Sequence, residues 1–385
     1  MSSRLLQFAR VIGVSALVLQ LTACFSVSRA ATQTDSPACA VKELKKSQIQ
    51  GVKTYAPDGG KYAITKEDAK GIHQIYIGRD GSAELTCITC TQRPRGPKPE
   101  RLKMAANWHP SGKWIFVPVE RDEYSTPPVL GWSRKFVEGM LHSGLWTNMW
   151  AVSPDGERWY RLTDFKSGVP GTADGFTGPV FTPDGKRAVW SQIVDGNVLV
   201  YTFGRWELIQ ADFQEKNGVP VLSNRKNITP AGMHWNEPGN FHPDNKSLLF
   251  SGSTEKDARG MDQYVLDITT SQLTNLTNSP TVWDEHGRFS PDGTKIIFMS
   301  AHPYRADPNS SKVLSIRTDF MLMNKDGTGL TQLTHFKEPG YPESSDGIAA
   351  SPEWSPDGGS ALLRQLFFPK YQYWDVVFQG SCGNS

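Results

Sequence analysis

The chain has 385 residues, and its formal net charge of +2 is dispersed along the sequence. No run of five or more Lys or Arg residues occurs, so a nucleic-acid surface is not expected. A chain of this length can bury a large core. It carries no Walker A motif, Rossmann glycine pattern or G-x-S-x-G motif, which argues against nucleotide-binding and α/β-hydrolase functions.

Residues 1–30 have the pattern of a signal peptide. Two arginines precede an apolar stretch at 11–22 that is too short to span a bilayer. Cleavage before Cys24, after Leu-Thr-Ala, would leave a lipidated cysteine as the only membrane attachment. Cleavage before Ala31, after Ser-Arg-Ala, would release the protein. Both positions remain open, and both predict an exported protein, periplasmic or extracellular.

An apolar or aromatic residue followed by x-Pro-Asp-Gly, or a close variant, occurs seven times, and a β-rich run such as KIIFMS follows six of these copies. We interpret the other copy, VSPDG at 152–156, as the turn between the last two strands of a blade, because it lies only a few residues before Leu162-Thr163. Pro presets φ and Gly tolerates a positive φ, so the phrase predicts a hairpin turn. Intervals of roughly fifty to seventy residues fit one four-stranded propeller blade with variable loops. The turn prolines are Pro57, Pro110, Pro183, Pro243, Pro291 and Pro356.

A second phrase, an apolar residue followed by Thr, comes late in each of the first five repeats and predicts the last strand of a blade. The sixth repeat lacks it, and we expect the segment 40–44 to supply the missing strand. This pairing would close the ring and remove exposed sheet edges. The predicted fold is all-β, a single six-bladed β-propeller over residues 31–385. The threonines are Thr89, Thr163, Thr229, Thr277 and Thr334.

Four cysteines remain beyond the signal segment. Cys39 and Cys382 flank the two segments expected to pair at ring closure, so a disulfide between them would staple the ring. Cys87 and Cys90 lie near the end of one predicted strand. No second Cys-x-x-Cys occurs, which favours a local bridge or two reduced thiols over a zinc site.

The strand that precedes each Pro-Asp-Gly turn should line the central channel. Counting back from the turn places Glu237 and Glu285 at equivalent positions in adjacent repeats, with His234 and His286 beside them. Two carboxylates and two histidines can serve as an acid–base set, and we predict these four residues as catalytic. The alternative is a structural role in hydrogen bonds between blades.

The same two stretches carry further candidates for ligand contact. Trp235 and Trp283 can stack on a sugar ring or another flat ligand, and Asn236 and Asp284 offer polar contacts. A divalent metal is possible at His234, Glu237, Glu285 and His286, whose side chains are suitable ligands. Because no compact ligand motif is present, no metal ligand is assigned and no cofactor is predicted.

An insertion at 121–148 in the second repeat has apolar residues at helical spacing from Trp132 onward, followed by Trp146. We expect a rim loop or short helix that either covers the funnel or packs on the surface. His302 and Arg305, in a loop of the fifth repeat, are expected on the same rim.

The phrases FSPDGTKIIFMS at 289–300 and NKDGTGLTQLTHF at 324–336 resemble the repeat of the TolB-like propeller family. The pattern covers roughly residues 45–380. The resemblance implies an exported six-bladed propeller. Members of the family include periplasmic partners of outer-membrane lipoproteins, propeller halves of peptidases, and propellers that act alone. The repeat marks turns and strands rather than a site.

Two functions follow from these observations, and the sequence leaves both open. The first is a propeller that binds a protein, a glycan or a small ligand at its funnel rim. The second is a lyase, hydrolase or isomerase that uses Glu237, Glu285, His286 and His234 as acid and base.

Overall fold

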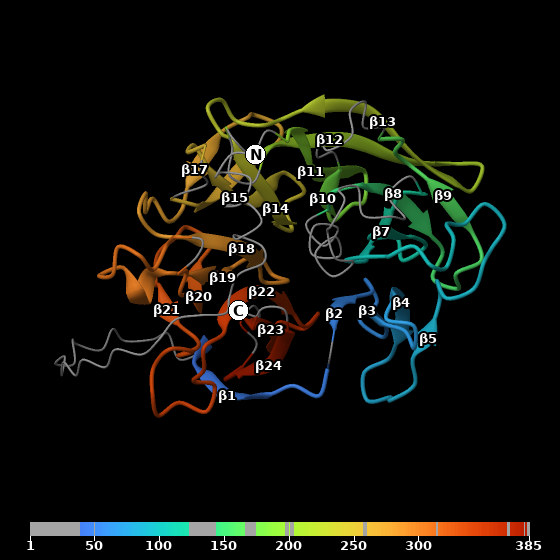
Figure 1. Ribbon diagram of the computed structural model, residues 1–385. Helices are drawn as coiled ribbons and strands as arrows, with labels where there is room; N and C mark the ends of the chain where they lie inside the picture. The colour runs from blue at the N-terminus through green and yellow to red at the C-terminus, as the bar shows by residue number, and fades with distance from the viewer. Residues whose placement is uncertain are drawn as a thin grey trace, which may run out of the picture.

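The computed structural model describes residues 39–49, 51–122, 144–165, 175–196, 200, 204–256, 260–312, 315–367, 370–380 and 382. These residues form six antiparallel sheets of four strands each, arranged in a ring around a central axis (Figure 1). The all-β six-bladed propeller expected from the repeats is confirmed.

The blades follow one another along the chain. Blade 1 contains β2 (Val52–Tyr55), β3 (Tyr62–Glu67), β4 (His73–Gly78) and β5 (Thr86–Cys87). Blade 2 contains β6 (Asn107–Trp108), β7 (Ile115–Glu120), β8 (Thr147–Val152) and β9 (Trp159–Arg161). Blade 3 contains β10 (Phe176–Phe181), β11 (Arg187–Asp195), β12 (Arg205–Lys216) and β13 (Val219–Asn227).

The second half of the ring repeats the order. Blade 4 contains β14 (Trp235–Phe241), β15 (Ser247–Ser253), β16 (Asp262–Asp267) and β17 (Leu273–Asn275). Blade 5 contains β18 (Asp284–Phe289), β19 (Lys295–Ser300), β20 (Asp319–Asn324) and β21 (Thr331–Gln332), with a 3-10 helix at His302–Tyr304. Blade 6 contains β22 (Ile348–Trp354), β23 (Ser360–Phe367), β24 (Lys370–Phe378) and β1 (Val41–Lys46).

The Pro-Asp-Gly turns are held by their own side chains. In blade 5 the Ser290 hydroxyl donates to Asp292 Oδ1 at 2.6 Å, and the same oxygen accepts the Thr294 N–H at 3.0 Å. Gly293 takes a φ of 78°, a value that favours glycine. Each repeat therefore places the same turn between its first two strands.

In the apolar-Thr phrase, the threonine side chain takes the place of a backbone hydrogen bond between strands. In blade 5 the Leu333 N–H donates to the Phe320 carbonyl at 2.8 Å, and the Thr334 hydroxyl accepts the Phe320 N–H at 2.9 Å. The hydroxyl thus satisfies a buried backbone group that the short outer strand does not reach. The equivalent bonds in the other blades join Ile75 to Thr89, Met149 to Thr163, Leu208 to Thr229, and Gln263 to Thr277.

The ring closes between the two ends of the described chain. Strand β1 pairs with β24, which confirms the N-terminal closure. A disulfide joins Cys39 to Cys382 across a sequence separation of 343, and Leu44 packs against the same core cluster. A second disulfide joins Cys87 to Cys90, whose Cα atoms are 5.8 Å apart.

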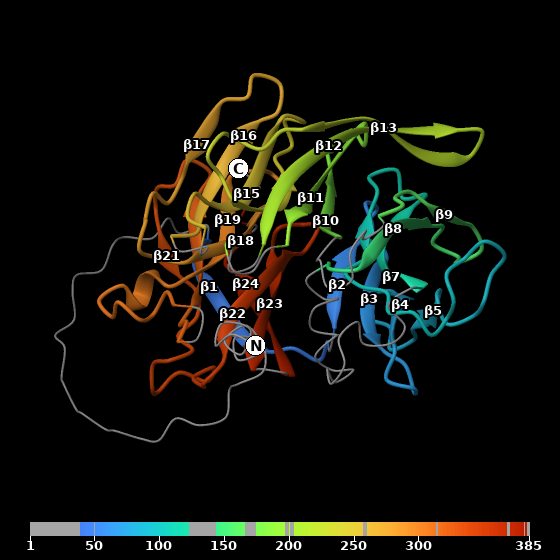
Figure 2. The same cartoon turned by 45° about the horizontal axis from the view of Figure 1, so that its top comes forward.

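Blade 3 has a long outer hairpin that reaches toward blade 2 (Figure 2). The Trp114 indole donates to Glu215 at 3.1 Å, and Arg225 donates to the Leu162 carbonyl at 2.7 Å. These contacts fasten the outer edges of two blades to each other.

Three sequence-based predictions concern residues largely outside the described ranges. They are the signal peptide at 1–30, the helix around Trp132, and the lid role of the insertion at 121–148. In the part of the chain that the structure describes, no helix is long and apolar enough to cross a membrane.

Candidate functional site

The inner strands of blades 4 and 5 approach each other through two glycines. A Cβ atom added to Gly239 of β14 would lie 2.3 Å from the carbonyl oxygen of Gly287 in β18, closer than real contacts allow. Glu237 is two residues before Gly239, and Glu285 is two residues before Gly287. The two glutamates therefore also lie near the contact between the strands. The repeated Glu-x-Gly-x-Phe sequence therefore brings polar side chains of two blades together.

Three side chains meet at this contact, and we call Glu237, Glu285 and His286 the Glu–His cluster. His286 Nε2 lies 3.5 Å from Glu237 Oε2, and His286 Nδ1 lies 4.0 Å from Glu285 Oε2. One ligand atom from each residue lies within 4.8 Å of the others. The side chains of Glu237 and His286 are 23% and 22% exposed, so solvent reaches the cluster.

A local distortion of β18 places two consecutive residues in one cluster. The ladder between β18 and β19 shifts register between Glu285 and Arg288, and His286 has a φ of 57°. In a regular strand, adjacent side chains point to opposite faces. The bulge and the left-handed residue turn Glu285 and His286 toward the same place.

Hydrogen bonds orient the histidine ring. Nδ1 lies 3.0 Å from the Ala350 carbonyl of blade 6, and because a carbonyl only accepts, Nδ1 carries the proton. Nε2 then faces Glu237 across the contact between blades. The backbone N–H of His286 donates to the Ser251 hydroxyl at 2.9 Å, which ties the bulge to blade 4.

The two carboxyl groups titrate in opposite directions. Burial raises the pKa of Glu285, the charge of Glu237 adds to this rise, and His286 and an indole hydrogen bond offset it only in part. Burial also opposes ionisation of Glu237, but His286, Arg288 and Arg364 outweigh it and lower its pKa. Burial disfavours the charged imidazole of His286, yet Glu285 and Glu237 outweigh it and raise its pKa.

The two predicted tryptophans lie beside Glu285 rather than open to ligand. The Trp283 indole, 6% exposed, donates to Glu285 Oε2 at 2.9 Å. A hydrogen bond from Trp235 also acts on Glu285. The Trp235 ring packs edge-on against Trp206, with centroids 5.6 Å apart.

The polar candidates Asp284 and Asn236 point into the blades. Asp284 accepts hydroxyl hydrogen bonds from Ser279 at 2.6 Å and Ser300 at 2.5 Å, and burial raises its pKa to about 6. The Asn236 amide donates to the Trp206 carbonyl at 2.7 Å. Both side chains are buried, so their contacts are those of inter-strand links.

The remaining predicted residues lie outside the Glu–His cluster. His234 precedes β14, where its backbone pairs with Ser253 and Trp206. His302 begins the 3-10 helix, and Arg305 follows it. Trp146 is buried in blade 2.

Sequence reasoning missed charged residues on blades 5 and 6. Arg364 of β23 lowers the pKa of Glu237, and its buried Nε has no hydrogen-bond partner among the residues that the structure describes. Burial raises the pKa of Glu353, on the inner strand β22, to about 7, although Arg288 and Lys53 oppose the rise. Glu353 and Arg288 both directly precede the aromatic residue of their turn phrase, so the repeat register could have identified them.

No protein-family model and no curated protein matches the sequence. Solved structures do match. A putative TolB from Agrobacterium tumefaciens is 18% identical, with 74% of each chain covered and a TM-score of 0.46. A puromycin-hydrolysing peptidase from Mycobacterium tuberculosis is 11% identical and has a TM-score of 0.51. The match covers 87% of this chain and 44% of the peptidase, so the chain spans less than half of that protein.

An oligogalacturonate lyase in complex with manganese also matches, with 11% identity, a TM-score of 0.46, and coverage of 89% of this chain and 98% of the lyase. At such identities the similarity concerns the fold and not the activity. The sequence repeats and the six closed blades agree. The chain is a six-bladed β-propeller.

Proposed function

We propose that the Glu–His cluster is the centre of an acid–base enzyme that acts on a glycan or a small polar molecule in the propeller funnel. The observation that carries this proposal is the geometry of two carboxyl groups around one histidine, with Nε2 3.5 Å from Glu237 and Nδ1 4.0 Å from Glu285. The lowered pKa of Glu237 and the raised pKa of Glu285 agree with it. Environments that shift the pKa values of two neighbouring carboxyl groups in opposite directions leave one group ready to accept a proton and the other ready to donate one.

In this proposal each residue has a role. Glu237, held ionised, accepts a proton from the ligand, and Glu285, which keeps its proton to higher pH, donates one to the leaving or neighbouring atom. His286 lies between them, within 3.5 Å of Glu237 and 4.0 Å of Glu285, and its positive charge stabilises the ionised Glu237. Solvent then removes the proton from Glu237 and returns one to Glu285. The cluster ends each cycle unchanged, which suits lyase, hydrolase or isomerase chemistry.

The test is turnover by the mature protein against a panel of glycans and small polar esters, lactones and hydroxy acids. Glu285→Gln should abolish turnover while the thermal midpoint stays near that of the wild type, and His286→Ala should abolish turnover in a protein that still folds, although it is less stable. Glu343→Gln is the matched control, since Glu343 Oε1 lies 3.6 Å from His335 Nδ1 in another histidine–carboxylate pair. Unchanged turnover in both cluster variants would refute the proposal.

Binding without turnover is the second candidate function, and one observation favours it. Polar groups of the cluster already have partners in the protein, since His286 Nδ1 binds the Ala350 carbonyl of blade 6 and Glu285 accepts from Trp283 of its own blade. A protein, glycan or small ligand would then be held at the rim without chemistry. Ligand binding that Glu285→Gln weakens, in a protein with no turnover, would assign this function.

The cluster also fits a divalent cation, since carboxylate and imidazole groups are common ligands and outer hydrogen bonds orient two of the three. A bound cation would polarise a ligand oxygen. Metal analysis of the purified protein and a thermal shift with Mn²⁺ or Zn²⁺ test this. The shift should disappear in Glu285→Gln.

We infer that the protein is exported, because both disulfides belong in an oxidising compartment and the N-terminal segment has the pattern of a signal peptide. The intact mass of the mature chain distinguishes cleavage before Cys24, with its lipid, from cleavage before Ala31.

A further inference from the structure

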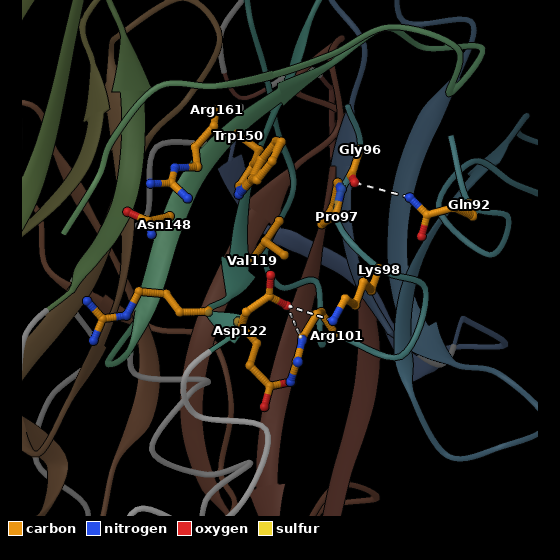
Figure 3. Close-up of a pocket in the computed structure, with 12 residues that line it drawn as sticks. Gln92, Gly96, Pro97, Lys98, Arg101, Val119, Asp122, Asn148, Trp150 and Arg161 are labelled. Carbon is orange, nitrogen blue, oxygen red and sulfur yellow. Dashed lines mark hydrogen bonds and ion pairs between the residues drawn. The ribbon is translucent and has the colours of Figure 1, made fainter. Parts of the chain in front are cut away.

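A pocket of about 430 Å³ lies on the other half of the ring from the Glu–His cluster (Figure 3). One wall is the connection between blades 1 and 2, including Lys98 and Arg101. The opposite wall comes from blade 2, with Trp150 on β8 and Arg161 on β9. We call this the basic pocket. It takes no part in the chemistry proposed above.

The basic pocket has an excess of positive charge. Four cationic side chains line it, those of Lys98, Arg101, Arg121 and Arg161, against two acids, Glu120 and Asp122. The formal excess of cations over acids predicts attraction for anions.

One contact shows where an oxyanion can sit. The Arg101 side chain is 8% exposed, and its Nε donates to Asp122 Oδ1 at 2.8 Å. Asp122 itself is 67% exposed, and Lys98 Nζ lies 3.9 Å from the same oxygen. A buried guanidinium and an amine therefore face a carboxylate that solvent can displace, and guanidinium groups match carboxylate and phosphate geometry.

An aromatic side chain adjoins this oxyanion position. Trp150 is half-buried, braced by Trp159 with ring centroids 6.2 Å apart, and Figure 3 shows it beside Arg161 on the wall opposite Lys98. Arg161 has an ion pair with Asp164, outside the pocket lining, and its side chain remains 44% exposed. An indole next to cations suits a ligand that joins a flat ring to a charge.

A buried lysine holds the backbone of the wall that carries Lys98. Lys103 is fully buried, and its Nζ donates to the carbonyls of Lys98 at 3.0 Å and Pro99 at 2.8 Å. The backbone at Lys98 and Pro99 is therefore held by a buried side chain, which limits the backbone entropy lost when a ligand binds.

We propose that the basic pocket binds a small anion, a carboxylate or phosphate carried on a flat ring, with the oxyanion against Arg101 and Lys98 and the ring against Trp150. Asp122 occupies the oxyanion position in the free protein and competes with the ligand. This competition gives the proposal a variant that should strengthen binding.

Calorimetry on the full mature chain tests the proposal with benzoate and phenyl phosphate, each compared with its neutral counterpart, benzamide or phenol. At least one anion should bind, more weakly as salt is added, and the neutral molecules should not. The anion that binds more tightly, benzoate or phenyl phosphate, shows whether the pocket prefers a carboxylate or a phosphate. Binding of neither anion, or equal binding of the neutral molecules, would overturn the proposal.

Variants separate the two halves of the ligand. Lys98→Gln should weaken anion binding about tenfold, as expected for the loss of one charged hydrogen bond, and Trp150→Leu should weaken phenyl phosphate but not inorganic phosphate. Asp122→Asn should tighten binding, and weaker binding in this variant would contradict the proposal. Lys186→Gln, at a side chain 80% exposed in a turn of blade 3, is the control. Glu285→Gln should leave anion binding unchanged, which separates this test from that of the proposed enzyme.

Discussion

The cluster depends on His286, because this residue of blade 5 also contacts blades 4 and 6. Its backbone N–H is bound to Ser251 of blade 4, its Nδ1 faces Ala350 of blade 6, and its Nε2 faces Glu237. A histidine held this way between two carboxylates keeps its proton to higher pH than a free imidazole does.

Glu237→Gln should therefore destabilise the protein in a pH-dependent way. The raised pKa of His286 means that its charge stabilises the fold below about pH 6.5, the unfolded value, and that this contribution is lost as pH rises through the folded pKa. The lowered pKa of Glu237 keeps the carboxylate ionised in that window. Urea unfolding should show a cost of about 1–3 kcal/mol at pH 6 and less at pH 9.

NMR titration of the histidines should also show a lower pKa for His286 in this variant. Glu67→Gln is the control, because the pair of Glu67 with His73 is exposed at the glutamate and contributes little. An equal cost of Glu237→Gln at both pH values would show that the imidazolium charge does not contribute.

The position of Glu237 and Glu285 could be predicted from the sequence, whereas their surroundings could not. Counting back from the turn succeeds because the ladders of blades 4 and 5 both shift register after the glutamate, between Pro238 and Phe241 in one and between Glu285 and Arg288 in the other. The side chain of His286 joins the cluster because this residue has a φ of 57°, and no pattern in the sequence predicts that value. Arg364 was missed because it lies on β23, a strand outside the inner set.

Among the elements, the inner strands β14 and β18 determine whether the cluster exists. Gly239→Ala would place a methyl group 2.3 Å from the Gly287 carbonyl and 3.1 Å from that of Leu249. Both obstacles are backbone, so the strands must separate. We expect a loss of about 1–3 kcal/mol in the free energy of unfolding.

Separation of the strands should also lengthen the contact between Glu237 and His286, so Gly239→Ala should lower the pKa of His286 measured by NMR. Gly60→Ala is the matched control, because the nearest atom to its added Cβ would be 3.8 Å away. A stable variant with an unchanged His286 pKa would mean that the glycine contact does not position the cluster.

At the scale of the whole molecule, the missing strand of the sixth repeat predicted how the ring closes. A propeller needs its last blade completed, and the only strand left unassigned in the described chain was β1. The sequence could not predict the basic pocket, because one wall is the connection between blades 1 and 2 and the other is blade 2, and the two meet only in the folded protein.

The Cys39–Cys382 disulfide should be the main covalent contribution to stability. It restricts the unfolded chain over a sequence separation of 343, whereas Cys87–Cys90 spans 3. In the chain-entropy account, a long closed loop is worth about 2–5 kcal/mol and a very short one far less. Replacing Cys39 and Cys382 together with Ala should lower the free energy of unfolding by that amount, measured by guanidinium unfolding without reductant.

Reduction separates the bond from the side chains that form it. Dithiothreitol should destabilise the wild type about as much as the double substitution does, and it should change the Cys39→Ala/Cys382→Ala variant little. Cys87→Ala/Cys90→Ala should stay close to the wild type without reductant and lose stability when reductant is added. If the removal of both cysteines at ring closure had no effect, the pairing of β1 with β24 and the packing of Leu44 would alone be sufficient to hold the ring closed.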